Sequence, residues 1–185
     1  ADKPDSQDIC FIPFGDYRKF LKERLTPKPG RLVDTNGKVL GEHRGIEFFT
    51  IGQRRGLGVA SGAPLYVTSI DPTSGDVTIG PNEDLLEDRL VASHVRYVSD
   101  REPAEGLEID VKIRYKSTDT PALLYPRGNN AIVQFREPQR AVTPGQGVVF
   151  YLGDEVLGGG RISRTKLKDL ISPRSNGAEA AHANA

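Results

Sequence analysis

Cysteine, methionine and tryptophan are almost missing from this chain of 185 residues, which contains one cysteine and neither of the other two. A single cysteine excludes an intramolecular disulfide framework and a multi-cysteine zinc site, and no metal site is predicted. It also fits a reducing, cytoplasmic compartment. The chain has no run of about 18 apolar residues, so no segment is predicted to span a membrane.

A net charge is missing as well, since Lys+Arg and Asp+Glu both number 25. Bulk electrostatics therefore gives no argument for binding to nucleic acid or to a membrane surface. Any basic surface must be local. The chain opens with Ala1-Asp2-Lys3-Pro4 and has no initiating methionine, so we expect it to be the later part of a longer protein.

The one cysteine, Cys10, lies in the string DSQDICFIP of residues 5–13. An isolated cysteine is most often a small buried apolar residue, which is one interpretation of Cys10. Polar residues precede it and apolar residues follow it, so a reactive thiol at the edge of a core is the other interpretation. The residue pattern alone leaves both open.

Residues 1–85 are predicted to form a small β-rich central domain with one short helix. Asp16 is typical of a helix N-cap, and apolar residues recur at helical spacing up to Leu25. Short apolar segments around glycine-centred turns then predict hairpins over 31–40 and 64–80.

Two features of this domain offer polar chemistry. The loop 51–59, IGQRRGLGV, sets three glycines beside Arg54 and Arg55. It could present N–H and guanidinium groups to a phosphate, or it could be a tight turn with solvated arginines. His43 could act as a base or a ligand, although such a histidine more often hydrogen-bonds within its own loop.

Residues 86–171 are predicted to form an antiparallel β-barrel, and 172–185 a disordered tail of small polar residues. The overall class is therefore mainly β, of the α+β type. The clearest strand is 107–116, where apolar and charged residues alternate. Further strands are expected at 89–98, 121–125, 130–136, 147–152 and 155–157.

A run of three glycines, 158–160, permits a close backbone approach that a side chain would block. Basic residues follow it, beginning with Arg161. They could contact phosphate, or they could simply be solvated.

Six separated strings form a further pattern: DSQDICFIP (5–13), GEHRGIEFFTIGQRRGLGV (41–59), PLYV (64–67), RYKSTDTPA (114–122), AVTPGQGVVFY (141–151) and LGGGRI (157–162). In this order and at these intervals they resemble the tRNA-specific 2-thiouridylases, a family that replaces the 2-oxygen of the wobble uridine with sulfur. The resemblance implies three parts: an N-terminal ATP-pyrophosphatase domain, a small central domain and a C-terminal β-barrel.

The first of these parts is missing from this sequence, which contains no SGGxDS phosphate-binding signature. The resemblance places the site for ATP and Mg in that missing domain, together with a second active-site cysteine. We therefore expect this chain alone to be inactive.

The resemblance further implies that Cys10 is the catalytic residue, which receives sulfur as a persulfide from a sulfur-relay donor protein. ATP activates the uridine carbonyl by adenylation. Cysteine suits the role because thiol exchange lets it carry a sulfane sulfur reversibly. Direct attack by the persulfide and release of hydrosulfide both stay open.

For tRNA binding, the resemblance points to Arg114, Tyr115 and Gln146. A continuous strand would send Arg114 and Tyr115 to opposite faces, so both can reach RNA only if the strand ends or bulges there. Arg54 and Arg55 are added as groups that position phosphate.

A competing hypothesis makes the chain a non-catalytic β-barrel module that binds RNA or another protein. Cys10 would then be a structural residue. The dependence of tRNA affinity on salt tests for RNA binding, because phosphate contacts release counterions.

Overall fold

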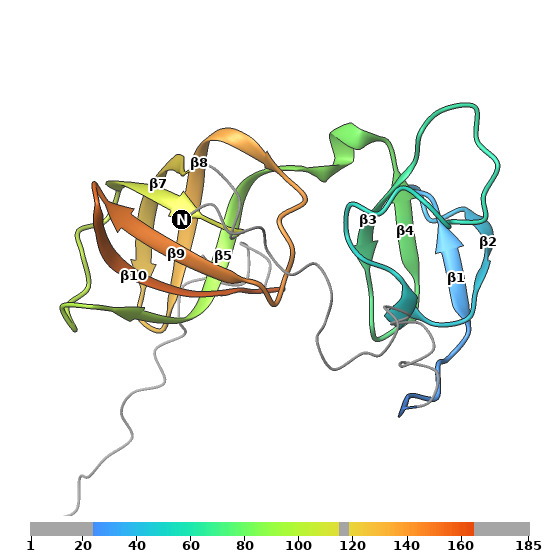
Figure 1. The fold of residues 1–185 in the computed structure, drawn as a ribbon, viewed down its shortest axis with the longest axis horizontal. Helices are drawn as coiled ribbons and strands as arrows, with labels where there is room; N and C mark the ends of the chain where they lie inside the picture. Colours follow the sequence, from blue (N-terminus) through green and yellow to red (C-terminus); the bar gives the residue numbers. More distant parts are fainter. Residues whose placement is uncertain (1–23, 115–118, 165–185) are drawn as a thin grey trace, which may run out of the picture. The chain divides into compact units, whose positions relative to one another are not determined.

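A computed structural model of the chain describes residues 24–114 and 119–164 (Figure 1). The described residues are mainly in strands, which confirms the predicted fold class. They divide into two compact units between Leu86 and Glu87, whereas the sequence places a boundary near residue 85. The predicted helix over 16–25 and the predicted tail lie largely or wholly outside the described residues; Arg24, the first described residue, is helical.

The central unit contains a four-stranded sheet in the order β2-β1-β4-β3. The predicted hairpins are both present. Its elements are β1 (Gly30–Val33), β2 (Val39–His43), η2 (Ile46–Phe48), β3 (Tyr66–Ile70), β4 (Val77–Gly80) and η3 (Asn82–Leu85).

The turn of the first hairpin shows why its sequence folds locally. Gly37 has a φ of 83°, a left-handed conformation that glycine adopts without cost. The Asp34 carboxylate accepts hydrogen bonds of 2.9 Å from the N–H groups of Asn36 and Lys38. The short polar residues of this turn therefore satisfy the backbone where the strand ladder ends.

The two hairpins meet along a short parallel pairing of β1 with β4, in which Leu32 lies opposite Val77 and Val33 opposite Thr78. Side chains reinforce this seam. Arg31 of β1 forms a bidentate ion pair with Asp76, in which its Nε donates to Oδ1 at 2.9 Å and its Nη2 donates to Oδ2 at 2.7 Å. The hydrogen bond from Arg31 lowers the pKa of the Asp76 carboxyl.

The core of the central unit joins apolar side chains of β1, β3 and β4 to the loop that contains Leu57. It is built from β-branched and leucine side chains, which pack well on a pleated surface. Its fully or nearly buried members are Leu32, Leu57, Val67, Val77 and Ile79.

The C-terminal unit is a closed barrel in the order β10-β5-β8-β7-β6-β9. Closure removes the exposed edges that an open sheet would have. The strands are β5 (Leu86–Tyr97), β6 (Leu107–Lys112), β7 (Thr120–Arg127), β8 (Asn130–Arg140), β9 (Gly147–Leu152) and β10 (Glu155–Ile162).

Alternation along the barrel strands sorts side chains into an inner and an outer set. In β6, Ile109 and Val111 are buried while Glu108 is exposed. In β9, Val148 and Phe150 are buried between residues that face outward. Fifteen buried residues form one continuous cluster inside the barrel.

Three details differ from the sequence prediction. The strand predicted over 107–116 ends at Lys112. The strand expected at 89–98 begins earlier and ends one residue sooner, as β5 (Leu86–Tyr97), and its residue His94 has a φ of 53°. The three glycines at 158–160 lie inside β10 rather than beyond a strand.

Close packing explains these glycines. A Cβ at Gly159 would lie 2.6 Å from the carbonyl oxygen of Val148, and one at Gly160 would lie 2.8 Å from that of Ser93. At Gly158 a Cβ would collide with the carbonyl of Arg96. The predicted close backbone approach is therefore made by the barrel itself.

Candidate nucleic-acid interface

The residue Gln146 is presented by a tightly defined turn, Thr143-Pro144-Gly145-Gln146. Gly145 has a φ of 92°, and the Gln146 N–H donates to the Thr143 carbonyl at 3.3 Å. Proline followed by a left-handed glycine is the sequence that a type II turn requires.

The same glycine forms a bulge against β10. Gly145 donates to the Ile162 carbonyl, and the Ile162 N–H donates to the Gln146 carbonyl, both at 2.8 Å. This is the pattern of a bulge with glycine at its first position. Hydrogen bonds to Thr143 and Ile162 thus fix the backbone of Gln146. Gln146 itself is exposed and lies directly before β9.

Arg114 reaches the segment that leads into this turn. It follows β6, and its guanidinium donates to the carbonyls of Arg140 and Ala141, the latter at 2.9 Å. Ala141 is a buried residue with a φ of 53°, an uncommon conformation for a residue other than glycine. Arg114 therefore holds a strained segment in place, a role that the sequence pattern did not reveal.

The structure thus brings Arg114 and the turn of Gln146 to one end of the barrel. The strand ends before Arg114, so the alternation that would have separated Arg114 from Tyr115 does not extend to them. Tyr115 lies outside the described residues, as does Cys10.

In the central unit, Arg54 and Arg55 lie in a loop shaped by three left-handed glycines, at φ values of 86°, 75° and 71° for Gly52, Gly56 and Gly58. The Gln53 side chain braces it by accepting the Thr50 N–H at 3.1 Å and donating to the Arg55 carbonyl at 2.9 Å.

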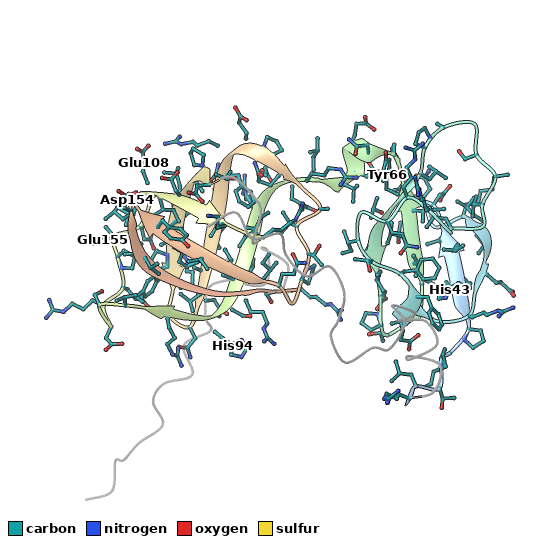
Figure 2. All side chains as sticks on the ribbon, viewed as in Figure 1. His43, Tyr66, His94, Glu108, Asp154 and Glu155 are labelled. Atoms are coloured by element: carbon teal, nitrogen blue, oxygen red, sulfur yellow. The ribbon has the colours of Figure 1, made fainter. Side chains whose placement is uncertain are left out.

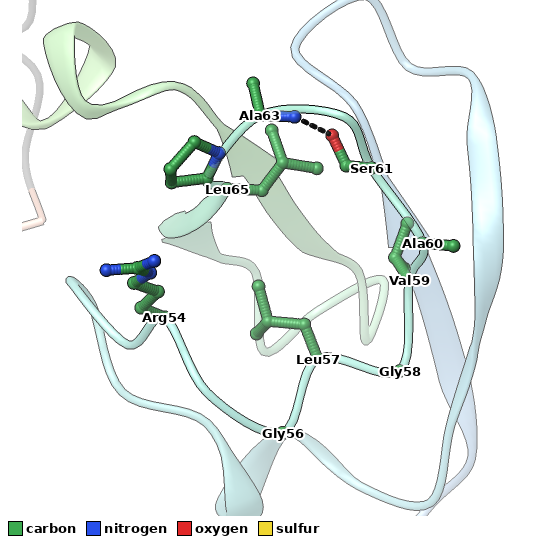
Figure 3. A pocket seen from close by; sticks show the side chains of 10 residues that line it. Arg54, Gly56, Leu57, Gly58, Val59, Ala60, Ser61, Ala63 and Leu65 are labelled. Carbon is green, nitrogen blue, oxygen red and sulfur yellow. Dashed lines mark hydrogen bonds between the residues drawn. The ribbon is translucent and has the colours of Figure 1, made fainter.

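An open hollow of about 440 Å³ lies within this loop (Figure 3). Arg54 and Leu57 line it from one stretch of the chain, and Leu65 lines it from the stretch that returns toward β3. Arg55 is exposed but is not part of the lining. Of the two arginines that the sequence grouped together, Arg54 lines this hollow and Arg55 does not.

His43, labelled in Figure 2, has a structural role, because both of its ring nitrogens bond backbone groups. It is 7% exposed; its Nε2 lies 3.0 Å from the Gly75 carbonyl, and its Nδ1 accepts the Gly45 N–H at 3.1 Å. With both nitrogens engaged, His43 bonds within its own surroundings, as such histidines usually do. Among the described residues, no three His, Cys, Asp or Glu side chains gather as a metal site would require.

Comparison with known proteins agrees with this two-unit architecture. A family model described as "tRNA methyl transferase PRC-barrel domain" matches residues 18–81, and one described as "Aminomethyltransferase beta-barrel domain" matches residues 87–162. The tRNA-specific 2-thiouridylase MnmA of Carboxydothermus hydrogenoformans is 50% identical over 167 residues, which are 89% of this chain. The chain belongs to the tRNA-specific 2-thiouridylase family.

Other tRNA-specific 2-thiouridylases match over the same two units. Those of Heliobacterium modesticaldum and Natranaerobius thermophilus are 47% and 45% identical, over 94% and 91% of this chain. The chain spans about half the length of these relatives, with 46%, 47% and 46% of the three proteins covered. It corresponds to the central and C-terminal region of the thiouridylase family.

No helix among residues 24–114 and 119–164 is long and apolar enough to cross a lipid bilayer.

Proposed function

We propose that this chain is the part of a cytoplasmic tRNA 2-thiouridylase that grips tRNA and carries the sulfur. One observation carries the proposal. The exposed Gln146 lies on a turn that two backbone hydrogen bonds fix to β10, and Arg114 donates to the segment before this turn. The relatives that match both units are named tRNA-specific 2-thiouridylases. A rigid turn suits recognition because little conformational freedom is lost on binding.

The barrel and the central unit contribute different groups to RNA binding. Gln146 can donate and accept hydrogen bonds, so it suits a base or ribose edge. Arg54, at its open hollow, suits a phosphate, which positions the RNA without reading its sequence. Tyr115 remains a proposed contact because the family resemblance implies it, and Arg55 remains one as a group that positions phosphate.

Cys10 is the proposed sulfur carrier. In the complete protein, bound ATP with Mg would supply the adenylation that makes the uridine 2-oxygen a leaving group. The terminal sulfur of a Cys10 persulfide would bond to C2, and AMP would leave with the oxygen. A second cysteine outside this chain would then attack the Cys10 sulfur, release the thiolated tRNA and leave a disulfide for a thiol reductant to reduce. Release of hydrosulfide by the same attack is the other route.

The test uses the full-length protein with a sulfur donor, ATP and a tRNA transcript. Cys10→Ser should abolish 2-thiouridine formation, measured by mass spectrometry of nucleosides, while tRNA affinity stays within about twofold because the thiol is not a phosphate contact. Thiolation retained by this variant would overturn the role of Cys10 and favour a binding module with a structural cysteine.

The 185-residue chain gives a second readout. It should bind tRNA with an affinity that falls as salt rises, yet neither hydrolyse ATP nor thiolate tRNA. ATP turnover by this chain would show that the adenylation site does not lie outside it.

A further inference from the structure

The outer face of β9, β10 and β5 carries a row of residues that the interface described above does not use. Strand register places Gly147 opposite Arg161, and Arg161 opposite Ser93. Their neighbours Val148, Ile162 and Ala92 are buried in the barrel. By alternation, the three paired residues lie on the outside.

Gly147 is unlike the three glycines of β10. A Cβ built on it meets no atom of the described residues within 4 Å, and its φ lies outside the left-handed region. Neither packing against the described residues nor backbone conformation requires glycine there, and the turn already has its own bulge glycine, Gly145. A glycine inside a strand weakens the strand and often marks a bulge, a bend, or a close approach by a ligand or by another backbone.

Arg161 stands directly beside this open position. It is exposed, and its side chain forms no hydrogen bond or ion pair with another described residue. The Ser93 hydroxyl donates to its main-chain carbonyl at 3.2 Å, which fixes the backbone that carries it. A guanidinium without an acidic partner keeps its full capacity for a phosphate.

The next row along the same face extends the positive charge. Its register runs from Lys112 to Val149, Gly159 and Arg96 across β6, β9, β10 and β5. None of the seven residues in the two rows is acidic, although Lys112 is itself paired with Asp119 at 3.1 Å. Arg96 is exposed, and within the described part of the chain its guanidinium bonds only neutral oxygens, those of Val95 and Asn129.

Acidic side chains gather elsewhere on this barrel. Figure 2 shows Glu108, Asp154 and Glu155 together at one end and His94 away from them. Register agrees, because Glu155 pairs with Leu152 at the opposite end of the β9–β10 hairpin from the Gly147–Arg161 pair. The Arg161 side of the barrel therefore presents Arg161, Arg96 and Lys112, of which Lys112 is paired with Asp119.

We propose that this face, with Arg161 and Arg96 as its cations and Gly147 as its point of closest approach, binds the phosphate backbone of tRNA. It begins next to Gln146, so one strand of RNA that touches Gln146 continues across it. The inference rests on the proposed function and adds a second contact surface to it.

The experiment measures binding of the 185-residue chain to an unmodified transcript of a tRNA with a wobble uridine, as a function of salt. Arg161→Gln should lower the slope of log Kd against log salt by about one, as loss of one phosphate contact does. Arg101→Gln, an exposed arginine in the 98–106 loop of the same barrel, is the matched control and should leave the slope unchanged.

Gly147→Ala tests the close approach separately. Its methyl group points into open space, so the melting temperature should not fall, while tRNA affinity should fall by about tenfold if a phosphate must come this close. Gly41→Ala is the control, because a Cβ built on this glycine of β2 makes only an ordinary contact, 3.8 Å from the Leu32 side chain.

The outcomes are distinct. Salt-dependent binding by the unchanged chain together with wild-type behaviour of Arg161→Gln and Gly147→Ala overturns this surface and leaves the proposed function standing. No salt-dependent binding by the unchanged chain overturns the proposed RNA contact, and this surface with it.

Discussion

The Arg114 guanidinium donates to the carbonyl of Ala141, five residues before Gln146, and so joins the segment after β6 to the segment that enters the turn of Gln146. This contact makes Arg114 a positioning residue for Gln146 as well as a proposed tRNA contact. The two residues should therefore act together on RNA binding.

A double-mutant cycle on tRNA affinity measures that dependence. If Arg114 acts through the turn, Arg114→Gln and Gln146→Ala together should cost less than the sum of the single changes, by about 0.5 kcal/mol or more. Arg114→Lys keeps the charge but loses the planar fork that reaches two carbonyls, so it should resemble Arg114→Gln. Additive losses, or wild-type tRNA affinity of the lysine variant, would show that Arg114 contributes charge alone.

Loss of the His43 ring nitrogens should destabilise the central unit. His43→Phe removes the partner of the buried Gly45 N–H and of the part-buried Gly75 carbonyl, which should cost roughly 1 to 3 kcal/mol of unfolding free energy. Denaturant unfolding measures the change. Glu42→Ala, an exposed residue of the same strand, should have little effect; equal effects of the two changes would contradict the bonding role of His43.

Removal of the Asp76 carboxylate should make the central unit less sensitive to acid. The bond from Arg31 lowers the pKa of Asp76 in the folded state, so the unfolded chain takes up more protons as pH falls through about 4, and stability falls with it. Asp76→Asn should flatten this loss in thermal unfolding followed by circular dichroism. Asp154→Asn, in an exposed turn of the barrel, should not.

Tyr97 has a hydroxyl buried in the barrel with no hydrogen-bond partner among the described residues. Tyr97→Phe should therefore leave stability at neutral pH unchanged or raise it by about 1 kcal/mol. A lower melting temperature for Tyr97→Phe at neutral pH would show that the hydroxyl is bonded in solution.

The same tyrosine predicts a loss of stability in alkali. Burial, with a smaller effect of Glu102, raises the pKa of Tyr97 to about 12. The unfolded chain loses this proton near pH 10, so stability should fall between about pH 10 and 12, by roughly 2 kcal/mol in total. Tyr97→Phe should remove this part of the alkaline loss, measured by denaturant unfolding at each pH.

The sequence predicted those parts of the fold that depend on local pattern. The hairpins follow from glycine-centred turns, and the barrel from alternation in segments such as β6. It could not predict that β1 pairs with β4, because that contact joins residues far apart in the chain. Nor could alternation show where β6 ends, since Ile113 continues the apolar pattern and is itself buried beyond the strand.

The candidate site was predicted by residue type but not by arrangement. Gln146 and Arg114 were named from the family resemblance, and the glycine-proline chemistry of the turn explains how Gln146 is held. The contact of Arg114 with a main-chain carbonyl leaves no signal in the sequence, because any segment offers carbonyls. The separate places of Arg54 and Arg55 likewise depend on how Gln53 and the left-handed glycines bend the loop.

The seam between the two hairpins of the central unit sets the order in which that unit can assemble. Each hairpin closes over a short loop, whereas the seam joins residues as far apart as Leu32 and Val77. The seam consists of two residue pairs between β1 and β4, supported by the side-chain hydrogen bonds of Arg31 and His43. Closing the longer loop costs more chain entropy and comes after the local contacts. Docking of the hairpins is therefore the late step in folding, and the amide protons at the seam should exchange with solvent before those within either hairpin.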